Sequence, residues 1–213
     1  MKQRDFIDNY RDLPVGKYEE IVKLCEDDMS EYDRRVAIVS ILSGLTEDEV
    51  LRLPLEKFTD YSARSRFIEH ECPENMIPGV SKNYPIGGFV LLPVTDIRKI
   101  TAAQYIDFQT FAQDRENKTV ELLSCFLIPR GKEYNEGYDV LEVHKAIREE
   151  MSVAECLALL AFFFKGWLLS IRSTLSYSAR IVRKIKNRDK KAALMMKIQD
   201  LLDSLADGVG TPI

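Results

Sequence analysis

The sequence predicts a mainly α fold, a multi-helix bundle that carries one small β-hairpin near residues 84–92. Apolar residues recur at helical spacing along most of the chain, as Tyr18, Ile21 and Cys25 do near the N-terminus. Several of these stretches open with a Thr or Ser that is followed three residues later by Glu or Gln, which is typical of a capped helix start. Only one stretch, around a Gly-Gly pair, has the character of paired strands.

The first part of the chain is predicted to form four helices. Residues 16–26 form the first, and Ser30 caps a second helix that Gly44 can end in a left-handed conformation. Thr46 opens a short third helix with a capping box. Residues 55–71 then show the apolar spacing of a fourth helix.

The middle of the chain carries the predicted hairpin and then more helices. Residues 84–86 and 89–92 are the strands, joined by a Gly-Gly turn. Thr101 and Ser152 begin capping boxes, residues 118–128 are apolar enough for a buried helix, and residues 140–151 form an amphipathic helix. The helix after Thr101 is expected to turn four apolar residues inward, namely Tyr105, Ile106, Phe108 and Phe111.

The C-terminal part is predicted to be a helical hairpin. Residues 153–171 are apolar and nearly long enough to span a bilayer, but Lys165 and Gly166 inside this stretch favour a buried core helix, and no membrane span is expected. The expected domain division is an N-terminal helical unit, a hairpin with a second helical unit, and the C-terminal hairpin, at residues 1–76, 77–152 and 153–213. Alternatively, the last two form one compact domain.

Two stretches of the chain resemble each other. The segment VGKYEEIVKLCEDD resembles TAAQYIDFQTFAQD, with Tyr18 opposite Tyr105, and VAIVSILSGL resembles VELLSCFLIP. This similarity suggests two duplicated helical units. The alternative is that amphipathic helices of one protein resemble one another without duplication.

Composition excludes several classes of protein. The chain has 213 residues, of which 46% are hydrophobic and 30% charged, so it is neither disordered nor too small for a core. A net charge of −4 gives no global positive field for nucleic acid. Four cysteines form no CxxC pair, and Cys25, Cys125 and Cys156 lie in apolar stretches. Buried thiols in the reducing cytoplasm are therefore expected.

No residue pattern points to catalysis, a metal or a cofactor. His70 and His144 have no partner at a catalytic or metal-binding spacing and are interpreted as solvated helix residues. Residues 69–72 include potential ligands, but adjacent helix residues point in different directions. Gly87 and Gly88 lack the flanking residues of a phosphate-binding loop. The sequence therefore predicts a protein that is not an enzyme and has no cofactor.

Two features near the C-terminus are candidates for partner binding. Aromatic residues crowd one apolar helical stretch, and residues 180–191 interleave cations with apolar residues. The basic stretch can be a solvated helix face, a site for an acidic protein, or a site for nucleic acid, which is the less favoured partner. The candidate partner-binding residues are Phe162, Phe163, Trp167, Arg180, Arg183, Lys184, Lys186 and Arg188.

Several phrases resemble a family of small helical phage proteins. LPVGKYEEIVKLCEDD, VAIVSILSGLTEDEVLRLPLEKF, KITAAQYIDF and LLSCFLIP are similar to segments of tailed-bacteriophage tail-assembly chaperones and related virion-assembly proteins. The resemblance covers residues 1–165 and carries no catalytic residues. It implies a non-enzymatic protein of the host cytoplasm or the virion that binds itself or other phage assembly proteins through apolar helix faces. A structural subunit or adaptor of the finished particle, or a nucleic-acid-associated regulator that uses residues 180–191, is the alternative.

Overall fold

The computed structural model describes residues 6–96, 99–113, 118–166 and 195–197. The chain divides into two compact units, the first made of Met1–Val94 and Thr101–Leu160 and the second of Thr95–Ile100 and Ala161–Ile213. The expected domain boundaries near residues 76 and 152 both fall inside the first unit. Of the predicted C-terminal helical hairpin, only residues 153–166 and 195–197 are described.

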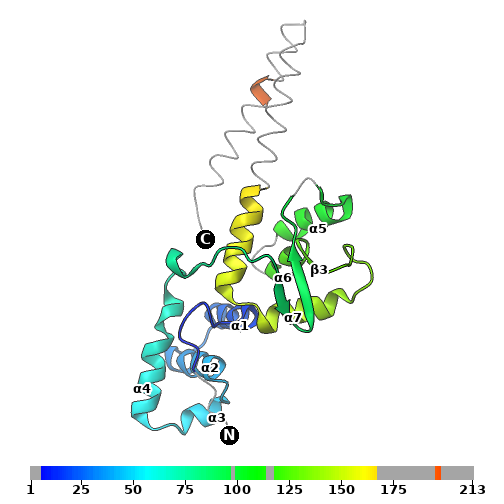
Figure 1. The fold of residues 1–213 in the computed structure, drawn as a ribbon. Helices are drawn as coiled ribbons and strands as arrows, with labels where there is room; N and C mark the ends of the chain where they lie inside the picture. The colour runs from blue at the N-terminus through cyan, green and yellow to red at the C-terminus, as the bar shows by residue number, and fades with distance from the viewer. Residues whose placement is uncertain (1–5, 97–98, 114–117, 167–194, 198–213) are drawn as a thin grey trace, which may run out of the picture. The chain divides into compact units, whose positions relative to one another are not determined.

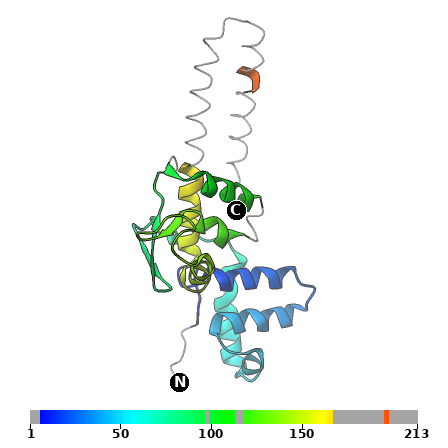
Figure 2. The same ribbon diagram turned by 90° about the vertical axis from the view of Figure 1, so that its right-hand side faces the viewer.

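The fold is mainly α with a small antiparallel sheet, as the sequence predicts. The N-terminal helices, blue to cyan in Figure 1, are α1 Val15–Glu26, α2 Glu31–Ser43, α3 Glu47–Leu51 and α4 Leu55–Arg64. The helices α1 and α2 lie side by side, joined by a short turn (Figure 2). Two 3₁₀ helices follow, at Ser65–Glu69 and Glu74–Met76, so the predicted fourth helix is shorter than residues 55–71.

The predicted helix ends are confirmed at atomic detail. The Ser30 side chain accepts a hydrogen bond from the Asp33 backbone, and Gly44 ends α2 with φ of 69°. Thr46 forms a complete capping box at the start of α3. Each of these contacts satisfies a backbone group that the helix itself leaves without a partner.

The predicted hairpin is confirmed, and it belongs to a sheet of three strands in the order β1-β2-β3. The strands β1 (Tyr84–Ile86) and β2 (Phe89–Pro93) are antiparallel, with Ile86 opposite Phe89. Gly87 and Gly88 both have positive φ, at 54° and 77°. A two-residue turn of this kind matches the twist of antiparallel strands.

The third strand, β3 (Leu127–Pro129), corrects the predicted helix over residues 118–128. Helix α6 (Thr119–Ser124) ends early, and the chain then pairs antiparallel with β2, Ile128 opposite Leu92. Pro129 disfavours a helical conformation at Ile128, and pairing with the edge of β2 gives residues 127–129 the strand conformation. The second half of the proposed duplication therefore departs from the first, since α2 continues as helix to Ser43.

The first unit also contains α5 (Ala102–Ala112), α6 and α7 (Val140–Glu150), of which α6 contacts β3 and α7 contacts β1 (Figure 1). A further helix begins at residue 153 in the first unit and continues to residue 166. Thr101 caps α5 in a box with Gln104, and Ser152 exchanges hydrogen bonds with Glu155, so both predicted capping boxes are confirmed. None of the helices in the described ranges is long and apolar enough to cross a membrane.

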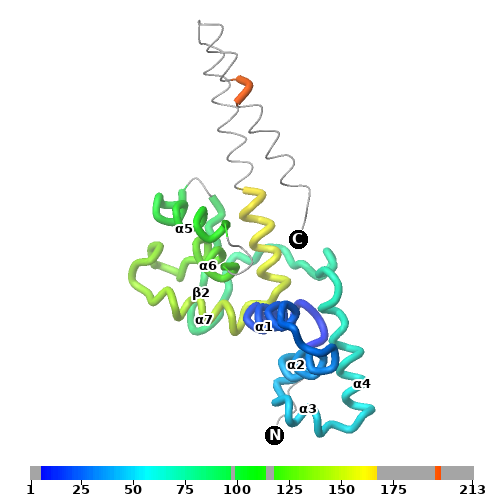
Figure 3. The backbone as a smooth tube through the Cα atoms, turned by 180° about the vertical axis from the view of Figure 1, so that it is seen from behind, coloured from blue at the N-terminus to red at the C-terminus, as the bar shows by residue number. Residues whose placement is uncertain are grey.

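Main-chain hydrogen bonds join the segment before α1 to the start of the helix at residues 153–166. The Val15 backbone donates to Met151, and the Val153 backbone donates to Leu13, at 2.9 Å each. Viewed from behind, α7 runs toward α1 (Figure 3), and the two helices are in contact. Segments far apart in sequence are thus joined by main-chain hydrogen bonds as well as by packing.

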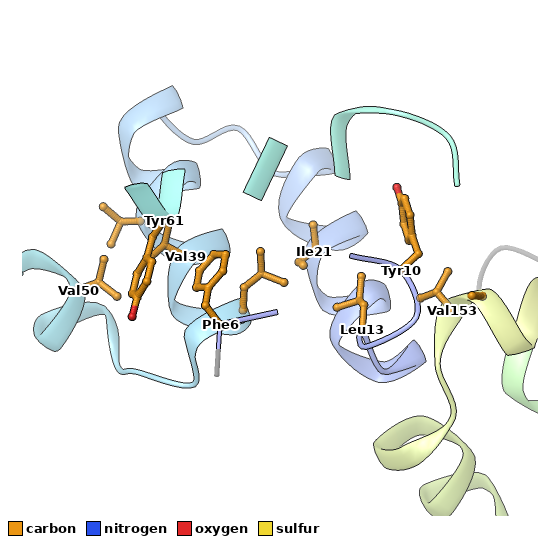
Figure 4. Packing of buried hydrophobic residues seen from close by; sticks show 11 residues of the cluster. Phe6, Tyr10, Leu13, Ile21, Val39, Val50, Tyr61 and Val153 are labelled. Atoms are coloured by element: carbon orange, nitrogen blue, oxygen red, sulfur yellow. The ribbon is translucent and has the colours of Figure 1, made fainter. Parts of the chain in front are cut away.

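One apolar cluster fills the centre of the N-terminal helices. Phe6 stacks on Tyr61 with ring centroids 4.4 Å apart. Figure 4 shows the cluster extending from Val50 and Tyr61, past Phe6 and Ile21, to Tyr10 and Val153. Removing such side chains from water is the main driving force that holds these helices together.

Two expectations about side-chain direction are wrong. On α5, Phe108 is buried, but Tyr105 is 40% exposed and Ile106 is 60% exposed. The inward position is taken by Gln104, whose amide donates to the Cys125 carbonyl at 3.0 Å. On α1, Cys25 is exposed, whereas Cys125 and Cys156 are buried as expected.

Candidate functional site

A group of exposed apolar side chains lies on α2, α3 and α4. Tyr32, Leu51 and Leu55 are 59%, 55% and 79% exposed. The Tyr32 ring lies 6.2 Å from the half-buried ring of Phe58, which is on the same side of α4 as Leu55. We call these four residues the α2–α4 apolar surface.

The helices fix the direction of each side chain. Val50 is buried, and consecutive helix residues point about 100° apart, so Leu51 at the end of α3 faces outward. Pro54 lies directly before α4, which begins at Leu55. Tyr61 packs into the core and Phe58 packs partly against it, whereas Leu55 at the start of α4 is exposed. The exposure therefore follows from how the core orients α3 and α4.

The α2–α4 apolar surface has acidic neighbours. The exposed acidic residues of α2, α3 and α4 are Glu31, Asp33, Glu47, Asp48, Glu49, Glu56 and Asp60. Most of them lie in first turns, where a negative charge also stabilises the helix N-terminus. Among the nearby cations, Arg64 pairs with Asp8 at 2.7 Å and with Asp60 at 3.7 Å, and Arg35 pairs with Glu69 at 3.1 Å. The acidic neighbours are thus only partly neutralised within the first unit.

Other exposed apolar residues in the first unit are more isolated. Leu141 on α7 is 73% exposed, and Tyr105 and Ile106 are neighbours on α5. Single exposed apolar residues are ordinary on protein surfaces, whereas contiguous groups mark interaction sites. The α2–α4 apolar surface is the stronger candidate, because Tyr32 and Phe58 are in ring contact between α2 and α4 and Leu55 lies one helical turn from Phe58.

A polar network between α6 and α7 contains the only serine–histidine contact in the described ranges. His144 Nε2 lies 2.9 Å from Ser124 Oγ, and the Ser124 hydroxyl donates to the Glu121 carbonyl at 2.7 Å. The contact joins α6 to α7. His144 is half-buried, so it is not the solvated residue that the sequence predicted.

Charges surround this network. Arg148 joins Glu19 at 3.2 Å and Glu121 at 3.4 Å, and Lys118 also contacts Glu121. Burial lowers the pKa of His144, Glu121 opposes this effect, and Arg148 and Lys118 reinforce it. His144 is therefore neutral in the folded protein at neutral pH.

We expect the stability of the protein to decrease as pH falls below about 6.5, the unfolded pKa of histidine. The folded state binds fewer protons than the unfolded state between the lowered folded pKa of His144 and that value. The contribution of His144 to the free energy of unfolding is complete above this pH window and is lost as the pH falls through it. Urea unfolding from neutral pH to about pH 5 measures the slope. A His144→Gln variant should show a shallower slope, and an equal slope would contradict this origin.

The structure describes only two of the residues predicted to bind a partner. Phe162 is 38% exposed, and Phe163 is buried, with ring centroids 5.5 Å apart. Phe162 is thus the member of the pair that offers an exposed ring. The other candidates lie outside the described residues, namely Trp167, Arg180, Arg183, Lys184, Lys186 and Arg188.

Within the described ranges, no group of three or more His, Cys, Asp or Glu residues could hold a metal ion. The chain matches no protein-family model, no curated protein and no solved structure. The function therefore has to be argued from the surface itself.

Proposed function

We propose that this protein is a non-enzymatic interaction protein of macromolecular assembly, and that the α2–α4 apolar surface binds a partner protein. The observation that carries the proposal is that Tyr32, Leu51 and Leu55, on three successive helices, are all exposed, with the Tyr32 ring against Phe58. Covering these side chains removes apolar area from water, which is the usual source of binding energy at a protein interface.

The acidic neighbours define the partner. Exposed carboxylates such as Glu47, Asp48 and Glu56 attract a segment in which apolar residues alternate with Lys or Arg. The same carboxylates repel the phosphates of nucleic acid, so a protein partner fits this surface better. Complementary charges at the rim mainly accelerate association and select the partner, while the apolar side chains provide the affinity.

The proposed setting is the assembly of a phage virion or tail. It rests on the similarity of the N-terminal phrases to tail-assembly chaperones, and it places the protein in the host cytoplasm or in the particle. A chaperone leaves the finished particle and a structural subunit stays, so purified particles distinguish these two roles.

The double variant Leu51→Ser/Leu55→Ser tests the surface. Both leucines are exposed, so the free energy of unfolding should change by less than about 1 kcal/mol. Affinity for the partner should fall at least about tenfold, because central apolar residues dominate interface energetics. The measurement is quantitative co-purification of the tagged full chain from its native host, followed by titration with the purified companion.

Leu141→Ser is the matched control, since this leucine is equally exposed but lies on α7. The proposal requires that one assembly protein co-purifies with the Leu141→Ser control but not with the Leu51→Ser/Leu55→Ser double variant. Equal retention by both variants, or equal loss, would show that the α2–α4 apolar surface is not the binding site.

A further inference from the structure

A pocket of about 350 Å³ lies where β2 begins and β3 ends. It is lined by Gly88, Phe89, Val90, Pro129, Arg130, Lys132, Gly137 and Tyr138. The start of β2, the end of β3 and the loop before α7 meet here because β2 and β3 are paired. The pocket is separate from the α2–α4 apolar surface and does not depend on the proposed function.

Two cations line the pocket and no acid does. Arg130 and Lys132 are exposed, and within the described ranges neither side chain forms an ion pair. Their backbones are fixed, because Arg130 donates to the Val90 carbonyl at 2.9 Å and Lys132 to the Pro129 carbonyl at 3.0 Å. Arg130 is thus held by β2, and Lys132 is held by the turn that follows β3.

The loop geometry supports the placement of Lys132. Gly137 has φ of 73°, and a Cβ built there would lie 3.3 Å from Lys132 Cδ. A larger residue would therefore be strained and would press on the lysine side chain. The Tyr138 hydroxyl accepts a hydrogen bond from the Asn135 backbone at 3.2 Å, which closes the loop beside the pocket.

The rest of the lining is apolar. Phe89 and Val90 are half-buried, and Pro129 is buried at the end of β3. Ligand pockets typically combine such a wall with a few polar groups, and their volumes begin near about 300 Å³. A pocket of this size accommodates a small molecule with one ring and one charged group.

We propose that this pocket binds a small organic anion in which a phosphate or a carboxylate is attached to an aromatic group. The anion contacts Arg130 and Lys132, and the ring packs on Phe89 and Pro129. Hydrogen bonds from cations to such anions are roughly twice as strong as neutral ones. The ring contributes burial that inorganic phosphate lacks.

The test is a titration of the full chain, followed by NMR chemical shifts, with phenyl phosphate, benzoate, inorganic phosphate and phenol. At least one aromatic anion should bind more tightly than both inorganic phosphate and phenol, and its identity tells whether phosphate or carboxylate is preferred. Arg130→Ala/Lys132→Ala should weaken that binding by at least about tenfold. Phe89→Ala should remove the advantage over inorganic phosphate, with circular dichroism to confirm folding.

Lys145→Ala is the control, because Lys145 is an exposed cation of α7 that does not line the pocket. Binding that is unchanged in this control supports the site. The proposal is overturned if neither aromatic anion binds, if phenol binds as tightly, or if Lys145→Ala weakens binding as much as the pocket variant.

Discussion

Replacing Phe126 with alanine should lower the free energy of unfolding by about 3–5 kcal/mol. The side chain is 1% exposed and meets Phe108 edge to face, with ring centroids 5.1 Å apart. Removing the ring leaves a cavity between α5 and the α6–β3 junction and takes away that aromatic contact. This loss is a large fraction of the free energy of unfolding of a typical domain, which is about 5–15 kcal/mol at 25 °C.

Urea unfolding at neutral pH measures this effect, with Leu141→Ala as the exposed control. The control should change the free energy of unfolding by less than about 0.5 kcal/mol. The main chain of residue 126 keeps its role in the variant, since its carbonyl accepts from Val94 at 2.8 Å and its amide donates to Leu123 at 2.9 Å. A loss below about 1 kcal/mol would contradict the packing described for Phe126.

The elements that the sequence predicted correctly depend on local chemistry. Thr46, Thr101 and Ser152 each begin a capping box, because the side chain and the residue three positions later satisfy each other's backbone. The turn at Gly87 and Gly88 needs positive φ at both positions, which glycine provides without strain. Such signals are readable because every contact lies within a few residues of the sequence.

The third strand could not be predicted in the same way. Residues 127–129 are too few to show a strand period, and they form a strand because β2 offers a free edge. Pro129 was the available signal, since it disfavours helix at Ile128. The pairing with β2 depends on contacts between distant parts of the chain.

The candidate sites were harder to predict than the fold. Leu51 and Leu55 are apolar residues of helical stretches, and nothing local distinguishes an exposed leucine from a buried one. On α5, Ile106 was expected inside, but Gln104 occupies the inner position through its bond to Cys125. In the pocket, the pairing of β2 with β3 brings Phe89 beside Arg130. Exposure and convergence are set by tertiary packing.

Replacing Gly87 with alanine should destabilise the protein by about 2–5 kcal/mol. Gly87 has φ of 54°, a conformation that costs an L-residue about 1–2 kcal/mol. A Cβ there would also lie 2.3 Å from the Ala146 Cβ, which requires the hairpin turn and α7 to separate. Overpacking of this kind typically costs a further 1–3 kcal/mol, to be measured by urea unfolding.

The variant Gly88→Ala separates the backbone cost of a positive φ from the steric cost of the contact with Ala146. The φ of Gly88 is 77°, and a Cβ built there meets no atom within 4 Å, so Gly88→Ala should show only the backbone cost of about 1–2 kcal/mol. Adding Ala146→Gly to Gly87→Ala should restore the free energy of unfolding that is lost to the steric contact. The recovery should fall short by about 1 kcal/mol, which is the cost of a glycine inside a helix. Equal losses for Gly87→Ala and Gly88→Ala, without recovery in the double variant, would mean that the turn does not press against α7. The predicted coupling between residues 87 and 146 therefore measures directly how closely the sheet packs on the helix that carries His144.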